Sequence, residues 1–445
     1  MFIIKVIAFS LGLWTISGLA FAQSGSGDDP IGRLLRGEAA GDKLPTAPVQ
    51  AVPAPLAPSA AGNGPLPMVM SARIGEHENS TRLVLELSDP VNLRTFTLVA
   101  PDRVVVDMPE VAWRLGAPPV PNAHGLIKSY RYGLFREGNS RMVIDLNRPV
   151  SVSDTLVLPP SSGFGYRVVI DFYPSQQAKF AANAGWPADL KARESAAEKA
   201  AMNLPPGTGG KKVVVIDPGH GGIDSGTHGV NGLLEKDLVL AEGLRLAQLL
   251  KIRGYTVHIT REKDVFIPLP QRVAMARKWR ADLLISLHAD SNPDPDISGL
   301  SIYTLSDGRS DREAAALASR ENQSDVIAGV DLSGENMPIA PILIDLAQRD
   351  TINKSSRFAE TALARLARST DLLKRSPHRS ASLAVLVAPD VPAVLIELGY
   401  LSNDDDAARM NTERWRAGLA AAVADSVDRN FLPEAGEETA AKNVR

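Results

Sequence analysis

The hydrophobic periodicity of this 445-residue chain changes near residue 211. Before that point, short β-branched runs such as TRLVLELSDPV and SRMVIDLNRPV are separated by Pro, Gly, Asn and Asp. After it, apolar strand-like runs alternate with amphipathic helical stretches. Because the chain is long enough for two folded domains, we expect an all-β sandwich domain over 68–173 and an α/β domain over 211–432.

The first domain contains an internal repeat. The segment RLVLEL at 82–87 recurs as RMVIDL at 141–146, and RVVVD at 103–107 recurs as RVVID at 167–171. Two similar β-halves that pack on one another would explain this repeat. The pattern resembles the AMIN domain, a β-sandwich module that targets periplasmic proteins to the cell wall. A β-sandwich that serves only as a spacer is the alternative.

The segments outside the two domains have simpler compositions. Residues 1–22 carry one basic residue, a continuous apolar stretch and the small-x-small end AFA, which predicts a cleaved secretory signal rather than a membrane anchor. Once it is removed, no other segment is apolar enough to span a bilayer. Residues 23–67 form a Pro/Ala-rich linker, 174–210 a second linker and 433–445 a polar tail. We therefore expect a secreted protein in the periplasm.

The amino-acid composition limits the partners and the metal ligands that the protein can use. The formal net charge of −3 gives no reason to expect nucleic acid as the main partner. The absence of cysteine excludes thiolate metal ligands and a cysteine nucleophile. Any bound metal must be held by nitrogen and oxygen, which suits zinc with His and Glu ligands.

The second domain has the order of elements typical of a mainly parallel sheet covered by helices on both faces. We expect helices over 235–253, 268–280 and 411–430. Strands are expected over 213–216, 255–260, 283–287, 300–304, 383–387 and 394–398.

Four ionisable residues lie at the edges of apolar runs in this domain: His220, Glu235, His288 and Glu397. An ionisable group at such a position needs a partner charge, hydrogen bonds or a metal to replace its hydration. Active sites of parallel sheets collect outside the carboxyl ends of the strands, so these residues can converge. His-Glu-His is a suitable ligand set for a catalytic zinc, and a further glutamate can accept a proton from water. Asp290 is a candidate to orient a ligand, with a solvated turn aspartate as the alternative.

The motifs DPGHGG, SLHAD and IELGYLSN, with Glu235 between the first two, resemble the zinc-dependent N-acetylmuramoyl-L-alanine amidases of the amidase-3 type. The resemblance covers about 211–430. It implies that zinc binds His220, Glu235 and His288, and that Glu397 is the general base. It also implies hydrolysis of the peptidoglycan amide that joins N-acetylmuramic acid to L-alanine. A zinc hydrolase of another cell-wall amide, such as a carboxypeptidase, and a non-catalytic wall-binding protein are the alternatives.

Residues 306–380 form an insert that is longer than a simple crossover requires. It is similar to the insert in the cell-division subgroup of these amidases, where a helix covers the zinc and contributes a glutamate until an activator binds. The match implies Glu321 as the inhibitory ligand and Glu313 as the second choice, with a solvated helical face as the alternative. The apolar stretch between Ile339 and Leu346 is expected to bind an activator of the LytM type, with ordinary core packing as the competitor.

Overall fold

The structure, a computed structural model, describes residues 65–116, 124–161, 163–192, 210–306, 310–331 and 346–431. The expected signal peptide, nearly all of the first linker and the polar tail lie outside these residues. So does the expected activator-binding stretch from Ile339 to residue 345, and the side chain of Leu346 is likewise outside the described part.

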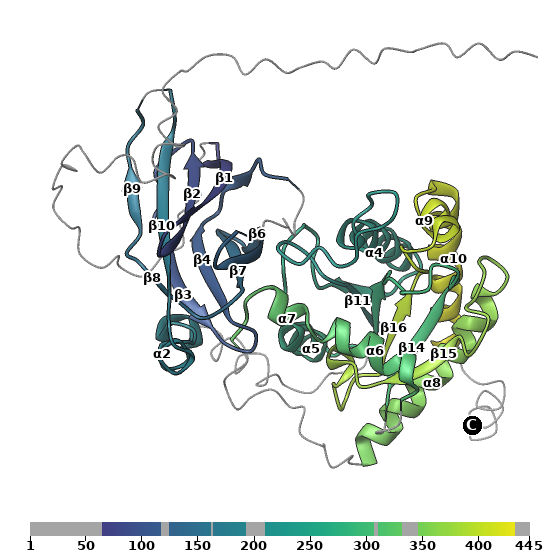
Figure 1. Cartoon of the computed structure of the whole chain (residues 1–445). Helices are drawn as coiled ribbons and strands as arrows, with labels where there is room; N and C mark the ends of the chain where they lie inside the picture. Colours follow the sequence, from purple (N-terminus) through teal and green to yellow (C-terminus); the bar gives the residue numbers. More distant parts are fainter. Residues whose placement is uncertain are drawn as a thin grey trace, which may run out of the picture.

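The first domain is a sandwich of two sheets packed face to face (Figure 1). One sheet has the order β5-β1-β2-β10-β8 with β9 beside β10, and the other has the order β3-β4-β7-β6. Alternate residues of both sheets point inward and form one apolar core, as a half-buried strand pattern predicts. The strands are β1 (Met68–His77), β2 (Ser80–Leu87), β3 (Arg94–Leu98), β4 (Arg103–Pro109), β5 (Ala112–Trp113), β6 (Ile127–Arg136), β7 (Asn139–Leu146), β8 (Val150–Val152), β9 (Leu156–Leu158) and β10 (Tyr166–Pro174).

The internal repeat takes an interleaved form. The two copies of the first repeated segment are β2 and β7, and the two copies of the second are β4 and β10. Because β2 pairs with β10 and β4 pairs with β7, each sheet takes one strand from each half. Arg82 and Asp171 form a bidentate ion pair with distances of 2.7 and 2.8 Å. The repeat-related residues Arg141 and Asp107 form an equivalent bidentate ion pair with distances of 2.6 and 2.9 Å.

The second domain contains one six-stranded sheet of order β12-β11-β13-β16-β14-β15. All neighbouring strands are parallel except β14 and β16, which are antiparallel. This confirms the predicted α/β class with a mainly parallel sheet, preceded by an all-β domain. The strands are β11 (Val213–Pro218), β12 (Thr256–Ile259), β13 (Leu283–His288), β14 (Ser301–Leu305), β15 (His378–Ala381) and β16 (Ala393–Glu397).

Helices cover both faces of this sheet (Figure 1). One apolar cluster joins the sheet to α4, α8 and α10, and a second joins its other face to α5, α6 and the 3-10 helix η2. None of the described helices combines the length and the apolar character that crossing a bilayer requires. The helices of this domain are α4 (Glu235–Ile252), α5 (Leu269–Lys278), α6 (Arg312–Glu321), α7 (Ser324–Ile327), α8 (Leu346–Leu366), η2 (Ala384–Leu386), α9 (Asp404–Met410) and α10 (Glu413–Phe431).

One strand prediction is wrong. The apolar run at 383–387 forms the 3-10 helix η2, and the edge strand β15 lies just before it. Leu383, Val385 and Leu386 are buried in the cluster that covers the sheet rather than lying within the sheet. A short apolar run has no periodicity that separates a strand from a buried helical turn.

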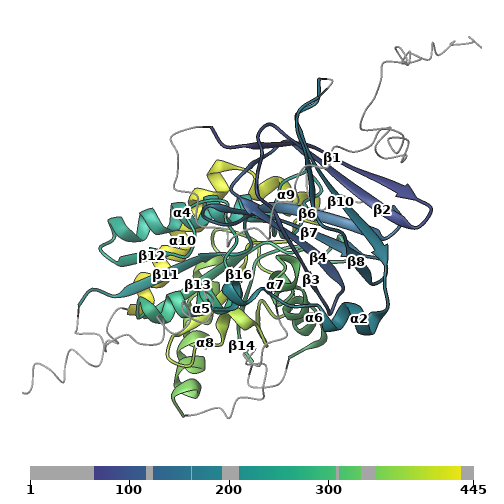
Figure 2. The same ribbon diagram turned by 90° about the vertical axis from the view of Figure 1, so that its left-hand side faces the viewer.

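The two domains share a small apolar core. Leu98, Val105 and Phe135 of the β-sandwich pack with Ile223 and Phe266 of the α/β domain. The amide of Phe266 donates to the carbonyl oxygen of β-sandwich residue Leu134 at 3.3 Å. The connector contributes α2 (Gln177–Ala182) and a helical turn at 188–192. The two domains lie side by side in Figure 1, and in the turned view of Figure 2 the β-sandwich lies in front of the α/β domain.

Candidate metal centre

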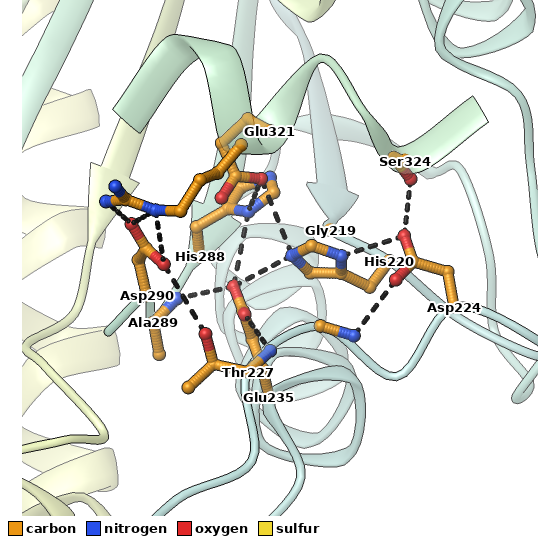
Figure 3. A network of polar contacts seen from close by, with 12 residues as sticks. Gly219, His220, Asp224, Thr227, Glu235, His288, Ala289, Asp290, Glu321 and Ser324 are labelled. Carbon is orange, nitrogen blue, oxygen red and sulfur yellow. Dashed lines mark hydrogen bonds and ion pairs between the residues drawn. The ribbon is translucent and has the colours of Figure 1, made fainter. Parts of the chain in front are cut away.

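Two histidines and two glutamates from four different elements converge in the α/β domain. His220 follows β11, Glu235 begins α4, His288 ends β13 and Glu321 ends α6. All four are buried, and one potential ligand atom from each lies within 4.8 Å of the others. Figure 3 shows Glu321 reaching the two imidazole rings from the helix above them.

The distances within this group are those of atoms arranged around a common point. His220 Nε2 lies 3.0 Å from Glu235 Oε1 and 3.5 Å from Glu321 Oε2. His288 Nδ1 lies 3.3 Å from Glu235 Oε1 and 2.9 Å from Glu321 Oε2. Within the described residues, His220 Nε2, His288 Nδ1 and Glu321 Oε2 are nevertheless buried without a hydrogen bond of good geometry. A cation held between these atoms would satisfy all three, so the residues present fit a bound metal.

The turn that carries His220 is held rigidly. A β-carbon on Gly219 would lie 2.4 Å from His288 Cε1, so only glycine lets the turn pass the second histidine. The buried Arg272 pairs with Asp217 at 2.9 Å and donates to the carbonyl oxygens of Pro218 at 2.7 Å and His220 at 2.6 Å. These charge-assisted bonds fix the backbone from which the His220 ring projects.

A further carboxylate orients His220. Asp224 Oδ2 lies 2.9 Å from His220 Nδ1 and also accepts a bond from the Ser324 hydroxyl, while Asp224 Oδ1 accepts from the Gly226 amide at 3.0 Å. Burial opposes ionisation of Asp224, but His220 and the hydrogen bonds lower its pKa to about 2. A carboxylate on the far nitrogen is the usual device that turns the other nitrogen toward a metal.

Backbone amides position Glu235. Its Oε1 accepts from the Ala289 amide at 2.8 Å, and its Oε2 accepts from the Thr227 amide at 2.8 Å. Its place in the first turn of α4 adds a favourable interaction with the exposed amides of the helix N-terminus.

The electrostatic field of the site is negative. Burial opposes protonation of His220, yet Glu235, Asp224 and Glu321 raise its pKa well above the usual value. Burial likewise opposes protonation of His288, but Glu321 and Glu235 raise its pKa to about 10. Both shifts have the same origin, an excess of carboxylates around two imidazoles, and this excess favours a bound cation.

Glu397 lies beside the group rather than within it. It is the register partner of His288 on the neighbouring strand, and it is fully buried. Its Oε2 accepts from the Asp290 amide at 3.0 Å, and its Oε1 has no hydrogen-bond partner among the described residues. Burial raises its pKa well above the usual value; Asp290, Glu321 and Glu235 add to this effect and His288 opposes it. The Asp290 amide therefore holds Oε2 in place, and Oε1 is available to accept a proton.

The Asp290 carboxylate, a candidate to orient a ligand, contacts the helix that carries Glu321. The carboxylate accepts bonds from Arg320 on α6, with Arg320 Nε 3.0 Å from Oδ2, and from the Ser291 amide at 2.6 Å. The Thr227 hydroxyl lies 3.4 Å from Oδ1. Burial raises the pKa of Asp290 to about 6, with a further contribution from Glu321 and an opposing one from Arg320. Asp290 therefore joins the sheet to the helix that carries Glu321.

The two candidate inhibitory glutamates lie at opposite ends of α6. Glu321 enters the group, whereas Glu313 lies on the surface and pairs with Arg379 at 2.8 Å. Sequence reasoning missed Asp224, Arg320 and Ser324. The only sequence signal for Asp224 is its place four residues after His220 in HGGID, and the other two depend on where α6 and α7 pack.

Both domains of the chain are similar to known proteins. Residues 214–429 match the family described as N-acetylmuramoyl-L-alanine amidase, and residues 71–157 match the AMIN domain. The chain is 34% identical to the N-acetylmuramoyl-L-alanine amidase AmiC of Neisseria meningitidis serogroup B, over 84% of this chain and 92% of that protein. It is also 34% identical to AmiC of Escherichia coli O6:H1, over 82% of this chain and 89% of that protein.

Another relative matches about half of this chain. The N-acetylmuramoyl-L-alanine amidase AmiA of Escherichia coli K12 is 38% identical over 49% of this chain and 76% of its own length. These matches confirm the expected enzyme class and the expected AMIN domain. The chain belongs to the N-acetylmuramoyl-L-alanine amidase family, with an AMIN domain before its catalytic domain.

Proposed function

We propose that this chain is a zinc-dependent peptidoglycan amidase whose active site is closed by α6 until a partner opens it. The observation that carries the proposal is the group of four buried ligand atoms within 4.8 Å of one another. The nitrogen and oxygen donors of two histidines and carboxylates suit zinc, and the chain has no cysteine to compete for it.

His220, Glu235 and His288 would hold the zinc ion. When bound, zinc supplies Lewis acidity that activates water and polarises an amide carbonyl. The substrate is the amide between the lactyl group of N-acetylmuramic acid and L-alanine, in agreement with the family to which the chain belongs.

Glu397 is the general base and acid of the reaction. Its Oε1 accepts the proton of the attacking water, while the Asp290 amide holds its Oε2 in place. The protonated carboxyl then delivers that proton to the leaving nitrogen of L-alanine. Burial keeps bulk water from competing for the proton.

Glu321 closes the site. A catalytic zinc needs a position open to water and substrate, and Glu321 supplies a fourth protein carboxylate to the group. Three features hold it there. Arg320 makes an ion pair with Asp290, and the Ser324 hydroxyl donates a hydrogen bond to Asp224. The apolar face of α6 is buried against the domain through Ala314, Leu317 and Ala318. The closed and open arrangements are two states, and a partner that binds the open one shifts the population toward it.

The expected partner is an activator of the LytM type that binds between Ile339 and Leu346. That stretch lies between α7 and α8, so its capture can pull on the chain that carries Glu321. The signal-like residues 1–22 support a periplasmic location for the enzyme. The AMIN domain would direct it to the wall, and its proposed role there is daughter-cell separation.

Removal and return of metal tests this function. We expect chelator-treated protein to lose wall-degrading activity and zinc to restore it. Mass spectrometry of the products should find glycan strands free of peptide together with intact stem peptides. Shortened stem peptides still attached to glycan would instead indicate a carboxypeptidase. Wall binding without any hydrolysis, with activator present and zinc loaded, would indicate a non-catalytic protein.

A further inference from the structure

The β-sandwich presents a row of arginines to the segment that follows Glu321. Arg103 on β4, Arg131 on β6 and Arg141 on β7 lie on the sheet β3-β4-β7-β6, on strands that neighbour one another. Their guanidinium groups donate to consecutive main-chain carbonyl oxygens at the end of α7. Arg103 reaches Val326, Arg131 reaches Ile327, and Arg141 reaches Ala328 at 3.1 Å and Gly329 at 3.0 Å.

This contact is buried and closely fitted. Arg103 and Arg141 are at most 1% exposed. A β-carbon on Gly329 would lie 3.0 Å from Val143 and 3.1 Å from Val105, so the backbone of the segment rests directly on the sheet. Ala328 belongs to the apolar core that the two domains share.

The connector between the domains completes the contact. Trp186 Nε1 donates to the Gly329 carbonyl oxygen at 3.0 Å, and its backbone amide donates to Asp331 Oδ2 at 2.8 Å. Lys191 lies 3.1 Å from the same carboxylate oxygen. The carbonyl oxygens of residues 326–329 and the Asp331 carboxylate thus bond groups outside the catalytic domain, while the backbone amides of residues 327–330 bond residues 323–326.

The same short segment enters the metal centre at its other end. Five positions separate Glu321, which faces His288, from Val326, which Arg103 holds. Between them, Ser324 bonds Asp224, and Asp325 accepts from the Leu269 amide at 2.9 Å. A displacement of α7 from the sandwich is therefore expected to act on the chain that carries Glu321, because only this short connection and its two bonds lie between them.

We propose that the AMIN domain is a second anchor of the blocking segment. The arginine row formed by Arg103, Arg131 and Arg141 binds the end of α7, and this interdomain contact helps to keep Glu321 in the active site. The proposal rests on the proposed function, since it assumes that Glu321 blocks catalysis. It adds that a wall ligand or partner that changes the placement of the AMIN domain also changes the basal activity.

The internal repeat of the sandwich supplies a matched control. Arg103 on β4 and Arg167 on β10 occupy equivalent positions, and both are buried. Arg103 donates to the Pro101 carbonyl oxygen at 3.0 Å, and Arg167 donates to the Pro159 carbonyl oxygen at 3.1 Å. Only Arg103 also contacts α7, so Arg103→Met and Arg167→Met remove similar groups but different contacts.

The experiment uses the full-length zinc-loaded protein and two readouts. Hydrogen exchange of residues 322–331 reports the anchoring, and release of dye-labelled fragments from purified peptidoglycan reports the basal activity. Loss of one charge-assisted hydrogen bond should raise both the exchange rate of this segment and the basal hydrolysis by about tenfold in Arg103→Met. Arg167→Met should leave both at the wild-type level.

A second pair of variants avoids any change in the arginines. Gly329→Ala should have the same effect as Arg103→Met, because its new methyl group meets Val143 and Val105 and its φ is +70°. Gly138→Ala is its control, since Gly138 has a φ of +78° and nothing within 4 Å of the added carbon.

Three outcomes separate this proposal from the proposed function. Unchanged exchange at 322–331 in both Arg103→Met and Gly329→Ala would overturn the anchor. Faster exchange with unchanged hydrolysis, in a protein where Glu321→Gln is activated, would overturn the coupling of the anchor to the site. If Glu321→Gln itself gave no activation, the blocking role would be wrong, and the exchange data alone would decide whether the anchor exists.

Discussion

The ion pair between Arg320 and Asp290 predicts how strongly α6 is held closed. Arg320 Nε lies 3.0 Å from Asp290 Oδ2, Nη2 bonds the same oxygen, and the Asp290 side chain is only 4% exposed. Arg320→Ala would leave this carboxylate buried without its cationic partner while α6 is in place, with the Ser291 amide still bonded to Oδ1. That state would lose about 1.5–3 kcal/mol, the usual worth of a hydrogen bond to a charged group, whereas an open state in which Asp290 meets water would lose much less.

The expected change in rate follows from this difference. Because each 1.36 kcal/mol changes an equilibrium tenfold, the open population and the basal hydrolysis of purified peptidoglycan should rise about 10- to 100-fold. Arg312→Ala is the matched control, since Arg312 begins the same helix and is exposed. With a saturating activator, wild type and Arg320→Ala should reach the same rate. Equal basal rates for Arg320→Ala, Arg312→Ala and wild type, at equal zinc content, would refute the closure mechanism.

Three further variants test other parts of the structure. Glu397→Gln should retain bound zinc but lose about 10²- to 10⁴-fold in the activated rate; wild-type activity would exclude the general-base role. Glu242 is 2% exposed, both its carboxylate oxygens lack hydrogen-bond partners among the described residues, and burial raises its pKa to about 8 from 4.5. Since the folded state binds this proton more tightly, stability is lost as the pH rises from 4.5 to 8. Glu242→Gln should therefore be more stable than wild type at pH 8 by on the order of 3–5 kcal/mol in urea unfolding and equal to it near pH 4.5; parallel pH profiles would contradict this. Gly222→Ala places a carbon 1.9 Å from the Leu134 carbonyl oxygen, so it should loosen the domain contact and expose the 134–135 peptide to proteolysis, and wild-type resistance would argue against that contact.

Much of the site is local in sequence and could therefore be predicted. His220 and His288 follow apolar strands directly, and the ends of parallel strands meet at one edge of a sheet. Glu235 is the first residue of a helix whose apolar residues recur on the face toward the sheet. The strand order and the family resemblance are therefore sufficient to predict that these residues converge.

The remaining features depend on packing that no local pattern encodes. The run at 383–387 is as apolar as a strand, but its central residues form a buried 3-10 helix. The helix α8 lies within the predicted insert and was not predicted as a helix, although its residues Phe358, Ala362 and Leu366 are completely buried. The bond of Asp224 to Ser324 joins residues a hundred positions apart. The arginine row could not be predicted either, because its contact depends on how the two domains dock.

The central claim is that Glu321 shares one zinc ion with His220, Glu235 and His288. Diffraction data collected on both sides of the zinc absorption edge, from crystals of the full-length protein without activator, test it directly. The account predicts one anomalous peak among these four side chains, with Glu321 bound to the ion. An ion held by the other three residues and water, with Glu321 turned away, would contradict it.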